Sequence, residues 1–391
     1  MALPQPTSAE QQYSDTLKTI LRDQISQAGG WLSFADYMET VLYTPTIGYY
    51  SGGAAKFGAQ GDFVTAPEIS PLFGQTLARQ VATVLQTMQN GAILEFGAGS
   101  GKLAVALLQT LEMLGALPEY YNILDLSADL QQRQRTLFEQ HIPHLAARIR
   151  WLTTLPDRFT GVIIANEVLD AMPVHLISWK DNHILERGVI WQNQQLSWQE
   201  QPLTTGELFT IAQQLPPAEQ ARYAHDYNSE ISLANRHFMR SIADSLQQGM
   251  ILLVDYGFGQ NEYYHAQRSQ GTLMCHYRHY AHGDPFFLPG LQDITSHVDF
   301  SAVAQTAQEA DLRLTGYTTQ AHFLINCGIT DLLADTPADH TDHYFPLANQ
   351  VQQLVSPAEM GELFKVMGLS KGVDIHAATL GFARGDLRRL L

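Results

Sequence analysis

The spacing of hydrophobic positions along the chain indicates both helices and buried strands. Over residues 1–50 these positions recur three and four apart, which predicts helices broken at Gly29 and Gly30. Another helix is predicted from Pro71, because proline suits the first turn of a helix. From Ala92 onward, short apolar runs alternate with helical patterns, as in a parallel sheet that is covered by helices.

Residues 174–228 interrupt this alternation with short strand-like runs, each of which contains a tryptophan. We expect an inserted antiparallel layer here, which either covers a substrate or only extends the edge of the sheet. Beyond the insertion, the patterns predict a helix at 229–248, a strand at 250–254, a long loop at 258–298, helices over 321–369 and a last strand at 377–383.

The stretch from Ala92 to Lys102 combines a strand, a glycine loop and the start of a helix. Gly97, Gly99 and Gly101 stand at alternate positions, so the chain can turn sharply and a ligand can approach the backbone. The free N–H groups at the start of the following helix would face that ligand. Such a unit is typical of a nucleotide-type cofactor site at the carboxyl end of a parallel sheet.

Glu95 precedes the first glycine of this loop by two residues and narrows the choice of cofactor. A carboxylate attracts a ligand that carries an ammonium and a sulfonium, and it repels a pyrophosphate. The Gly-x-Gly-x-Gly spacing also differs from the Gly-x-Gly-x-x-Gly of dinucleotide-binding proteins. Both features disfavour a nicotinamide-dependent oxidoreductase. The alternative is a glycine-rich turn in an unrelated α/β protein.

Further polar residues fall where a cofactor of this kind needs them. Asp125 ends the second predicted strand, where an acidic residue accepts both ribose hydroxyls; alternatively, Asp125 or Ser127 only caps the next helix. Thr65 and Glu68 belong to the glycine-dense segment 51–70. That segment either covers a ligand or is an ordered surface loop.

The fourth predicted strand of the core ends in residues suited to bind a substrate. Asn166 offers a carbonyl acceptor to a substrate N–H. Glu167 and Asp170 would face one way on a helical turn and hold a guanidinium or an ammonium. In the alternative, Asn166 caps this turn and the two carboxylates only favour its dipole.

The composition restricts the partners and the location of the protein. A net charge of −16, from 23 basic and 39 acidic side chains without a Lys/Arg run, disfavours a nucleic-acid partner. No apolar run reaches the roughly 18 residues of a membrane helix, so no membrane insertion is expected. The N-terminus lacks an apolar signal and Arg-rich transit character, which predicts a cytoplasmic location.

Cysteine and histidine spacings predict no metal site. The chain has 2 cysteines, without a disulfide or metal pattern. His276, His279 and His282 lie three apart in the predicted loop, without a recognised set of ligands beside them. One of these histidines could instead serve as a general base, or all of them are ordinary loop residues.

Taken together, the motifs resemble those of the MidA-like family of class I S-adenosylmethionine-dependent methyltransferases, which includes a mitochondrial complex I assembly factor. The resemblance extends over nearly the whole chain. Asp125 departs from it, since glutamate is expected at that position. The motifs that carry the resemblance lie at residues 48–50, 61–68, 95–101, 165–173, 255–257, 271–273 and 293–300.

The resemblance implies a Rossmann-like α/β fold with a seven-stranded sheet, S-adenosylmethionine as cofactor, and methylation of arginine in a protein substrate. The alternative is a cofactor-binding assembly or scaffold protein with little or no catalytic activity. The expected segments are an N-terminal helical and glycine-loop part (1–90), the cofactor-binding half of the core (91–173), the inserted layer (174–228), and the rest of the core with its long loop (229–391).

Overall fold

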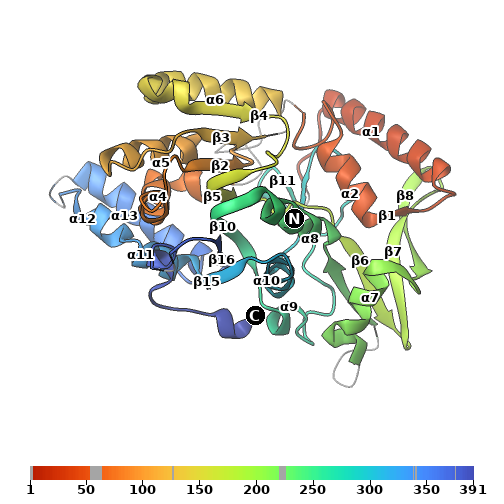
Figure 1. Cartoon of the computed structure of the whole chain (residues 1–391). Helices are drawn as coiled ribbons and strands as arrows, with labels where there is room; N and C mark the ends of the chain where they lie inside the picture. The colour runs from red at the N-terminus through yellow and green to blue at the C-terminus, as the bar shows by residue number, and fades with distance from the viewer. Residues whose placement is uncertain are drawn as a thin grey trace. The chain divides into compact units, whose positions relative to one another are not determined.

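The chain forms two compact units, which Figure 1 shows together. The computed structural model describes residues 3–52, 64–125, 127–219, 226–337, 339, 341–374 and 376–391. The first unit comprises Met1–Phe63, Asp170–His237 and Phe258–Asp299, and the second comprises Val64–Leu169, Phe238–Gly257 and Phe300–Leu391. The glycine motif lies in the second unit.

Within the described part of the second unit, seven strands form one sheet in the order β15-β16-β10-β5-β2-β3-β4. The strands from β10 to β4 run parallel, and β16 lies antiparallel between β10 and β15. This confirms the predicted seven-stranded sheet. Its strands are β2 (Ala92–Phe96), β3 (Tyr121–Leu124), β4 (Ile149–Leu152), β5 (Phe159–Asn166), β10 (Leu246–Phe258), β15 (Arg313–Thr319) and β16 (Phe364–Lys371).

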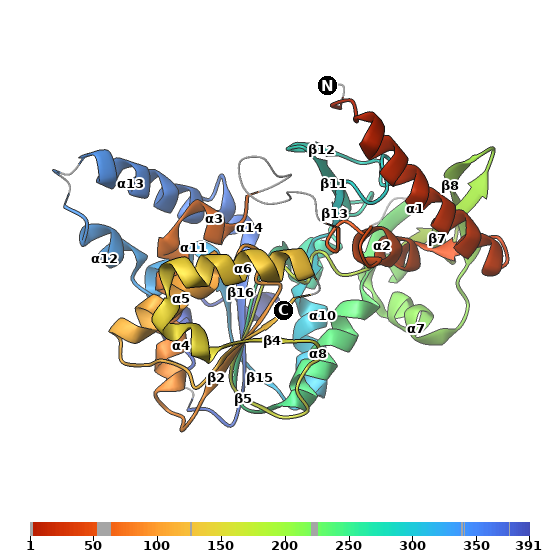
Figure 2. The same cartoon turned by 90° about the horizontal axis from the view of Figure 1, so that it is seen from above.

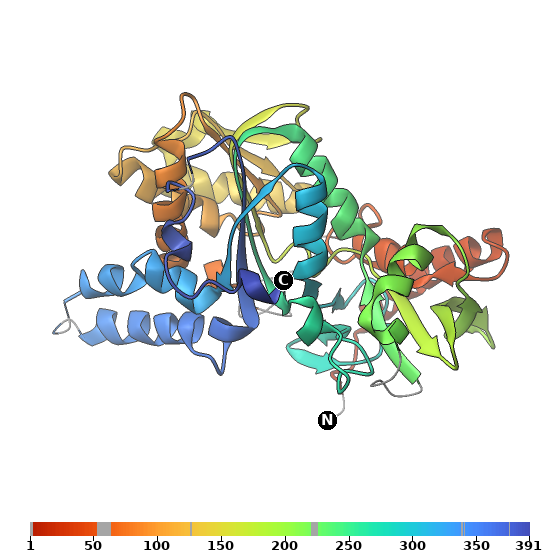
Figure 3. The same cartoon turned by 60° about the horizontal axis from the view of Figure 1, so that its bottom comes forward.

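Helices cover both faces of this sheet. Figure 2 shows α4 and α5 on one side and α10 on the other, and Figure 3 shows α11, α12 and α13 on the side of α4. The central strands β5 and β10 are therefore continuous apolar runs that are buried on both faces. The helices are α4 (Pro71–Leu85), α5 (Lys102–Met113), α6 (Ala128–His141), α8 (Leu233–Ser245), α10 (Phe300–Glu309), α11 (Gln320–Asn326), α12 (Ile329–Ala334), α13 (Thr341–Val355) and α14 (Met360–Leu363).

Short 3-10 turns complete the structure. They are η1 (Pro143–Arg148), η2 (Pro216–Glu219), η3 (Leu380–Phe382) and η4 (Arg388–Leu390). Among the residues that the structure describes, no helix is both long enough and apolar enough to cross a membrane.

The predicted last strand at 377–383 is wrong. The last strand in the described part of the chain is β16, which begins inside the region predicted to be helical, and residues 380–382 form η3 instead. The reason is packing. The ring of Phe382 lies against Gly316 and Gly368, where a Cβ on either glycine would collide with it. The apolar run at 377–383 therefore fills the surface over two strands and does not extend the sheet.

The first unit confirms the N-terminal helices and the inserted antiparallel layer. The helix α1 begins with a capping box, in which Thr7 and Glu10 satisfy each other's backbone N–H groups. An antiparallel sheet has the order β1-β7-β6-β9, with β8 on β7. These elements are α1 (Ser8–Gln27), β1 (Leu32–Ser33), α2 (Phe34–Tyr43), β6 (His175–Lys180), β7 (His183–Gln192), β8 (Gln195–Pro202), α7 (Gly206–Gln214) and β9 (Asp226–Ile231).

Two predicted boundaries in this part of the chain are wrong. Residues 229–231 belong to β9 rather than to a helix, because the Ser232 hydroxyl accepts the N–H of Asn235 and starts α8 only at Leu233. The predicted long loop 258–298 contains a small antiparallel sheet in the order β12-β11-β13. The strands of this small sheet are β11 (Met274–Tyr277), β12 (Tyr280–His282) and β13 (Asp293–Thr295). The helix α9 (Gln260–Tyr263) precedes them, and β14 (Val298–Asp299) follows them without joining this sheet.

Candidate functional site

The glycine loop joins β2 to α5 at the carboxyl end of the parallel strands. Gly97, Gly99 and Gly101 have φ angles of +61°, +53° and +87°, a region that L side chains rarely adopt. A Cβ on Gly101 would also lie 3.0 Å from the ring of Phe138. All three glycines are thus required by the backbone, and the loop leaves its main chain open to a ligand.

Glu95 is buried at the end of β2, with 3% of its surface exposed. The pKa of Glu95 is raised from 4.5 to about 7: burial is the main cause, the hydrogen bond from the Tyr121 hydroxyl lowers the pKa, and the nearby charge of Asp125 raises it. That hydroxyl donates a hydrogen bond to Glu95 Oε2 at 2.7 Å. The carboxyl is therefore partly protonated at neutral pH, and a cationic ligand beside it would favour the ionised form.

This pKa predicts a pH-dependent stability of the cofactor-free protein. Because the folded pKa is raised, the contribution of Glu95 is fully present below about pH 4.5 and is lost as pH rises through about 7. Glu95→Gln removes the titration. We expect Glu95→Gln to be more stable relative to wild type at pH 8 than at pH 5. The difference in the free energy of unfolding should be up to roughly 3 kcal/mol, and the melting temperature should shift in the same direction.

Thermal unfolding of wild type and Glu95→Gln at both pH values measures this effect. Glu139→Gln is the matched control, since it neutralises an exposed carboxylate on α6 of the same unit. A difference between Glu95→Gln and wild type that is the same at pH 5 and pH 8 would show that the folded pKa of Glu95 is not raised.

Asp125 follows β3 and faces the glycine loop through a shared partner. Its Oδ1 accepts a hydrogen bond from the N–H of Ser127 at 3.0 Å, and its Oδ2 accepts one from Nε2 of Gln134 at 3.1 Å. The capping of α6 falls to Ser127, whose hydroxyl accepts the N–H of Leu130. Asp125 is thus held in place by two donors and does not itself cap the helix.

Gln134 is a site residue that the sequence did not reveal. It is fully buried on α6, and its Nε2 also donates to the carbonyl oxygen of Gly99 at 2.9 Å. Its Oε1 accepts the indole N–H of Trp151 at 2.8 Å. One amide therefore ties the glycine loop, the end of β3 and strand β4 together. The available signal was an amide on the apolar stripe of a helix, four residues before Phe138.

We expect Gln134→Leu to weaken binding of the cofactor that the motif resemblance implies, S-adenosylmethionine, about 10-fold. The variant leaves the Gly99 carbonyl and the Trp151 indole N–H without their partner, and it releases one oxygen of Asp125. Isothermal titration measures the affinity. Gln132→Leu makes the same change at an exposed position of α6 and serves as the control. Equal affinities in the two variants would show that the amide does not support the site.

Glu68, on the short helix α3 (Ala66–Ile69), contacts the residues that follow the glycine loop. Glu68 Oε2 forms an ion pair with Lys102 Nζ at 2.6 Å, and its Oε1 accepts a hydrogen bond from the Ser100 hydroxyl. Thr65 is the N-cap residue of α3, and its side chain makes no capping hydrogen bond. The remainder of this predicted ligand-covering segment, residues 53–63, lies outside the described residues.

Asn166 is the last residue of β5, beside the strand that leads into the glycine loop, and Glu167 follows it. Asn166 Nδ2 donates to Glu167 Oε1 at 3.2 Å, whereas Asn166 Oδ1 is buried and has no hydrogen-bond partner among the described residues. The predicted helical turn from Glu167 to Asp170 is wrong. Glu167 has a φ of +52°, because its N–H and the next two backbone N–H groups are bound by β10 rather than by a helix.

Asp170 belongs to the first unit, where it is buried. Its carbonyl oxygen accepts the N–H of Ser296 at 3.0 Å. Burial, with the charges of Asp170 and Asp293, raises the pKa of Tyr43 well above its usual value. The second unit thus brings Glu68, Asp125 and the glycine loop together at the carboxyl end of the strands, with Asn166 at the end of β5. Asp170 instead lies near the tyrosines of the first unit.

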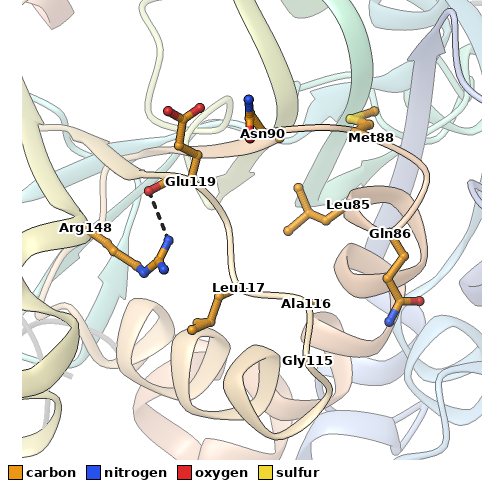
Figure 4. Close-up of a pocket in the computed structure, with 10 residues that line it drawn as sticks. Leu85, Gln86, Met88, Asn90, Gly115, Ala116, Leu117, Glu119 and Arg148 are labelled. Carbon is orange, nitrogen blue, oxygen red and sulfur yellow. Dashed lines mark hydrogen bonds between the residues drawn. The ribbon is translucent and has the colours of Figure 1, made fainter.

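A hollow of about 460 Å³ lies at the opposite end of the parallel strands (Figure 4). Gly91, Glu119 and Arg148 line it just before β2, β3 and β4 begin. Arg148 donates to the main-chain oxygens of Pro118 and Glu119, so its guanidinium is occupied by backbone.

Across the described stretches of the chain, no group of three or more His, Cys, Asp or Glu side chains could hold a metal ion.

Comparison with known proteins identifies the family. Residues 76–318 match a family described as "Putative S-adenosyl-L-methionine-dependent methyltransferase". The chain belongs to this methyltransferase family. It is also similar to a solved protein from Burkholderia thailandensis bound to S-adenosyl-homocysteine, at 48% identity and a TM-score of 0.95 over 100% of both chains. S-adenosylmethionine is therefore the cofactor, as predicted.

Curated relatives in animals are more distant. The mitochondrial protein arginine methyltransferase NDUFAF7 of Rattus norvegicus is 28% identical over 90% of this chain and 84% of its own length. The Drosophila melanogaster homologue is 25% identical over 95% and 88%. These matches agree with the family resemblance of the motifs. The predicted cytoplasmic location is wrong as judged by these relatives, which are named as mitochondrial proteins.

Proposed function

We propose that this methyltransferase transfers a methyl group to a nitrogen of an arginine side chain in a protein. The observation that carries the proposal is the pair of acceptors at the end of β5. There the buried Oδ1 of Asn166 lacks a partner among the described residues, and the Nδ2 of the same amide donates to the carboxylate of Glu167. A guanidinium supplies N–H donors and a positive charge together, which suits this pair.

The names of the relatives support the same acceptor. The rat, zebrafish and fruit-fly relatives are each named protein arginine methyltransferases. The net charge of −16 also favours a cationic acceptor over nucleic acid.

In the proposed mechanism, S-adenosylmethionine supplies an electrophilic methyl group attached to a sulfonium. Glu95 and the glycine loop would bind the cationic amino-acid end of the cofactor, and Asp125 would accept the ribose hydroxyls. Asn166 Oδ1 would accept one guanidinium N–H, and Glu167 would hold the charge and aim a nitrogen at the methyl carbon. The acceptor nitrogen would displace S-adenosyl-homocysteine from the methyl carbon and would release one proton to solvent. Alignment of acceptor and donor supplies much of the rate in such a displacement.

The test is to incubate the purified protein with methyl-labelled S-adenosylmethionine and a protein extract, and then to hydrolyse the extract to amino acids. We expect the label in methylarginine. Label in another amino acid would contradict the arginine acceptor. S-adenosyl-homocysteine binding without any labelled product would favour the alternative function, a cofactor-binding assembly or scaffold protein.

A further inference from the structure

Asp255 is a fully buried carboxylate at the carboxyl end of β10, and the proposed mechanism gives it no role. Its Oδ2 accepts the backbone N–H groups of Val168 at 3.2 Å and Leu169 at 2.9 Å. Its Oδ1 accepts the N–H of Tyr256 at 2.9 Å. A buried carboxylate is costly unless donors surround it, and here two of the three donors, Val168 and Leu169, come from the chain that follows β5.

The segment that Asp255 holds contains a strained residue. Glu167 has a φ of +52°, although it is not a glycine, and its own N–H donates to the carbonyl oxygen of Val254 at 2.9 Å. Left-handed conformations of such residues persist only where surrounding contacts enforce them, and they gather at functional sites. The hydrogen bonds from Glu167, Val168 and Leu169 to the end of β10 are those contacts.

The same segment lies against the cofactor loop. A Cβ built on Gly97 would be 3.5 Å from Cγ2 of Val168, so the turn and the glycine loop are in near contact. If Val168 and Leu169 moved away from Asp255, the turn that lies between the end of β5 and the cofactor loop in space would therefore move as well.

We propose that Asp255 is a positioning residue for methyl transfer. It fixes the backbone of residues 167–169 in the strained turn, and thereby holds Asn166 and Glu167 in the orientation that receives the acceptor. The inference rests on the proposed role of those two residues. Asp255 itself is buried beneath the turn and acts on the reaction only through the backbone.

The first test measures stability and needs no substrate. Asp255→Asn replaces one acceptor oxygen with a donor that faces backbone N–H groups, so we expect a lower melting temperature. In the background of Glu167→Gly the same change should lower the melting temperature by less than half as much, because glycine adopts a φ of +52° without enforcement. If Asp255→Asn alone does not fold, the double variant is expected to fold.

Glu230 offers a matched control for this cycle. It is a buried carboxylate of the first unit that also accepts two consecutive backbone N–H groups, from Thr272 at 2.8 Å and Leu273 at 3.0 Å. Glu230→Gln should lower the melting temperature equally with and without Glu167→Gly. Equal losses for Asp255→Asn in the two backgrounds would overturn the proposal.

The second test separates positioning from general stability. The assay uses labelled S-adenosylmethionine with a protein extract as acceptor, at a temperature where the variant is folded. We expect Asp255→Asn to lower kcat at least about 10-fold, while the Kd of S-adenosyl-homocysteine changes less than about threefold. Glu230→Gln should leave both within about twofold. Stability coupling without a loss of kcat would overturn the positioning role. An acceptor other than arginine would contradict the proposed function while leaving the coupling result intact.

Discussion

Replacing Gly99 with valine is expected to weaken S-adenosyl-homocysteine binding by roughly 100-fold or more. Gly99 has a φ of +53°, and a β-branched residue is an outlier in that conformation. Relaxing the backbone would also pull the Gly99 carbonyl from Gln134, which in turn holds Asp125. The loss therefore reaches two parts of the site, and isothermal titration with the purified protein measures it.

Gly115→Val is the control for the backbone strain alone. Gly115 has a φ of +64°, follows α5, and has no atom within 4 Å of the position its Cβ would take. It lines the hollow at the far end of the strands. We expect this variant to lose stability and to bind S-adenosyl-homocysteine as wild type does. An equal loss of affinity in both variants would mean that Gly99 matters only for folding.

Glu167→Gln is expected to lower methyl transfer by about 100-fold or more and to change S-adenosyl-homocysteine affinity by less than about threefold. The amide keeps the size of the side chain but removes the charge that would hold a guanidinium, and hydrogen bonds between charged partners are the stronger ones. The left-handed backbone is unchanged, so the turn is expected to keep its shape. Initial rates with labelled cofactor, together with titration, give both quantities.

Glu119→Gln is the matched control for that variant, because it neutralises an exposed carboxylate of the same unit at the opposite end of the strands (Figure 4). It should leave both turnover and affinity unchanged. A parallel fall of turnover and affinity in Glu167→Gln would assign its carboxylate to the cofactor rather than to the acceptor.

The order of the elements could be predicted where neighbouring residues determine it. The strand, the alternating glycines and the following helix occupy one short stretch, and their hydrophobic period is unambiguous. The sheet at the C-terminal end of the chain was predicted less well. Residues 364–371 do not alternate between apolar and polar side chains, because β16 is buried on both faces. The apolar run at 377–383 contains a 3-10 turn rather than a strand, because Phe382 packs on two glycines.

The candidate site divides in the same way. Glu95 and the glycines could be found from their spacing, whereas Gln134 and Asp255 act on residues far away in the sequence, 35 positions for Gly99 and 87 for Val168. Those contacts also explain the error at Glu167. The neighbouring residues in the sequence favour a helical turn. In the structure, however, the N–H groups of residues 167–169 donate to acceptors on β10 and are not available to a helix. No local pattern contains that information.

The place of β16 has a consequence for synthesis of the chain. Strand β10 leaves the ribosome well before β16, yet one of its edges pairs with β16, from Gly249 with Lys371 to Tyr256 with Phe364. Until more than a hundred further residues have been translated, that apolar edge has no strand beside it and is open to pairing with other chains. Nascent chains that stall before Phe364 are therefore expected to depend on chaperones.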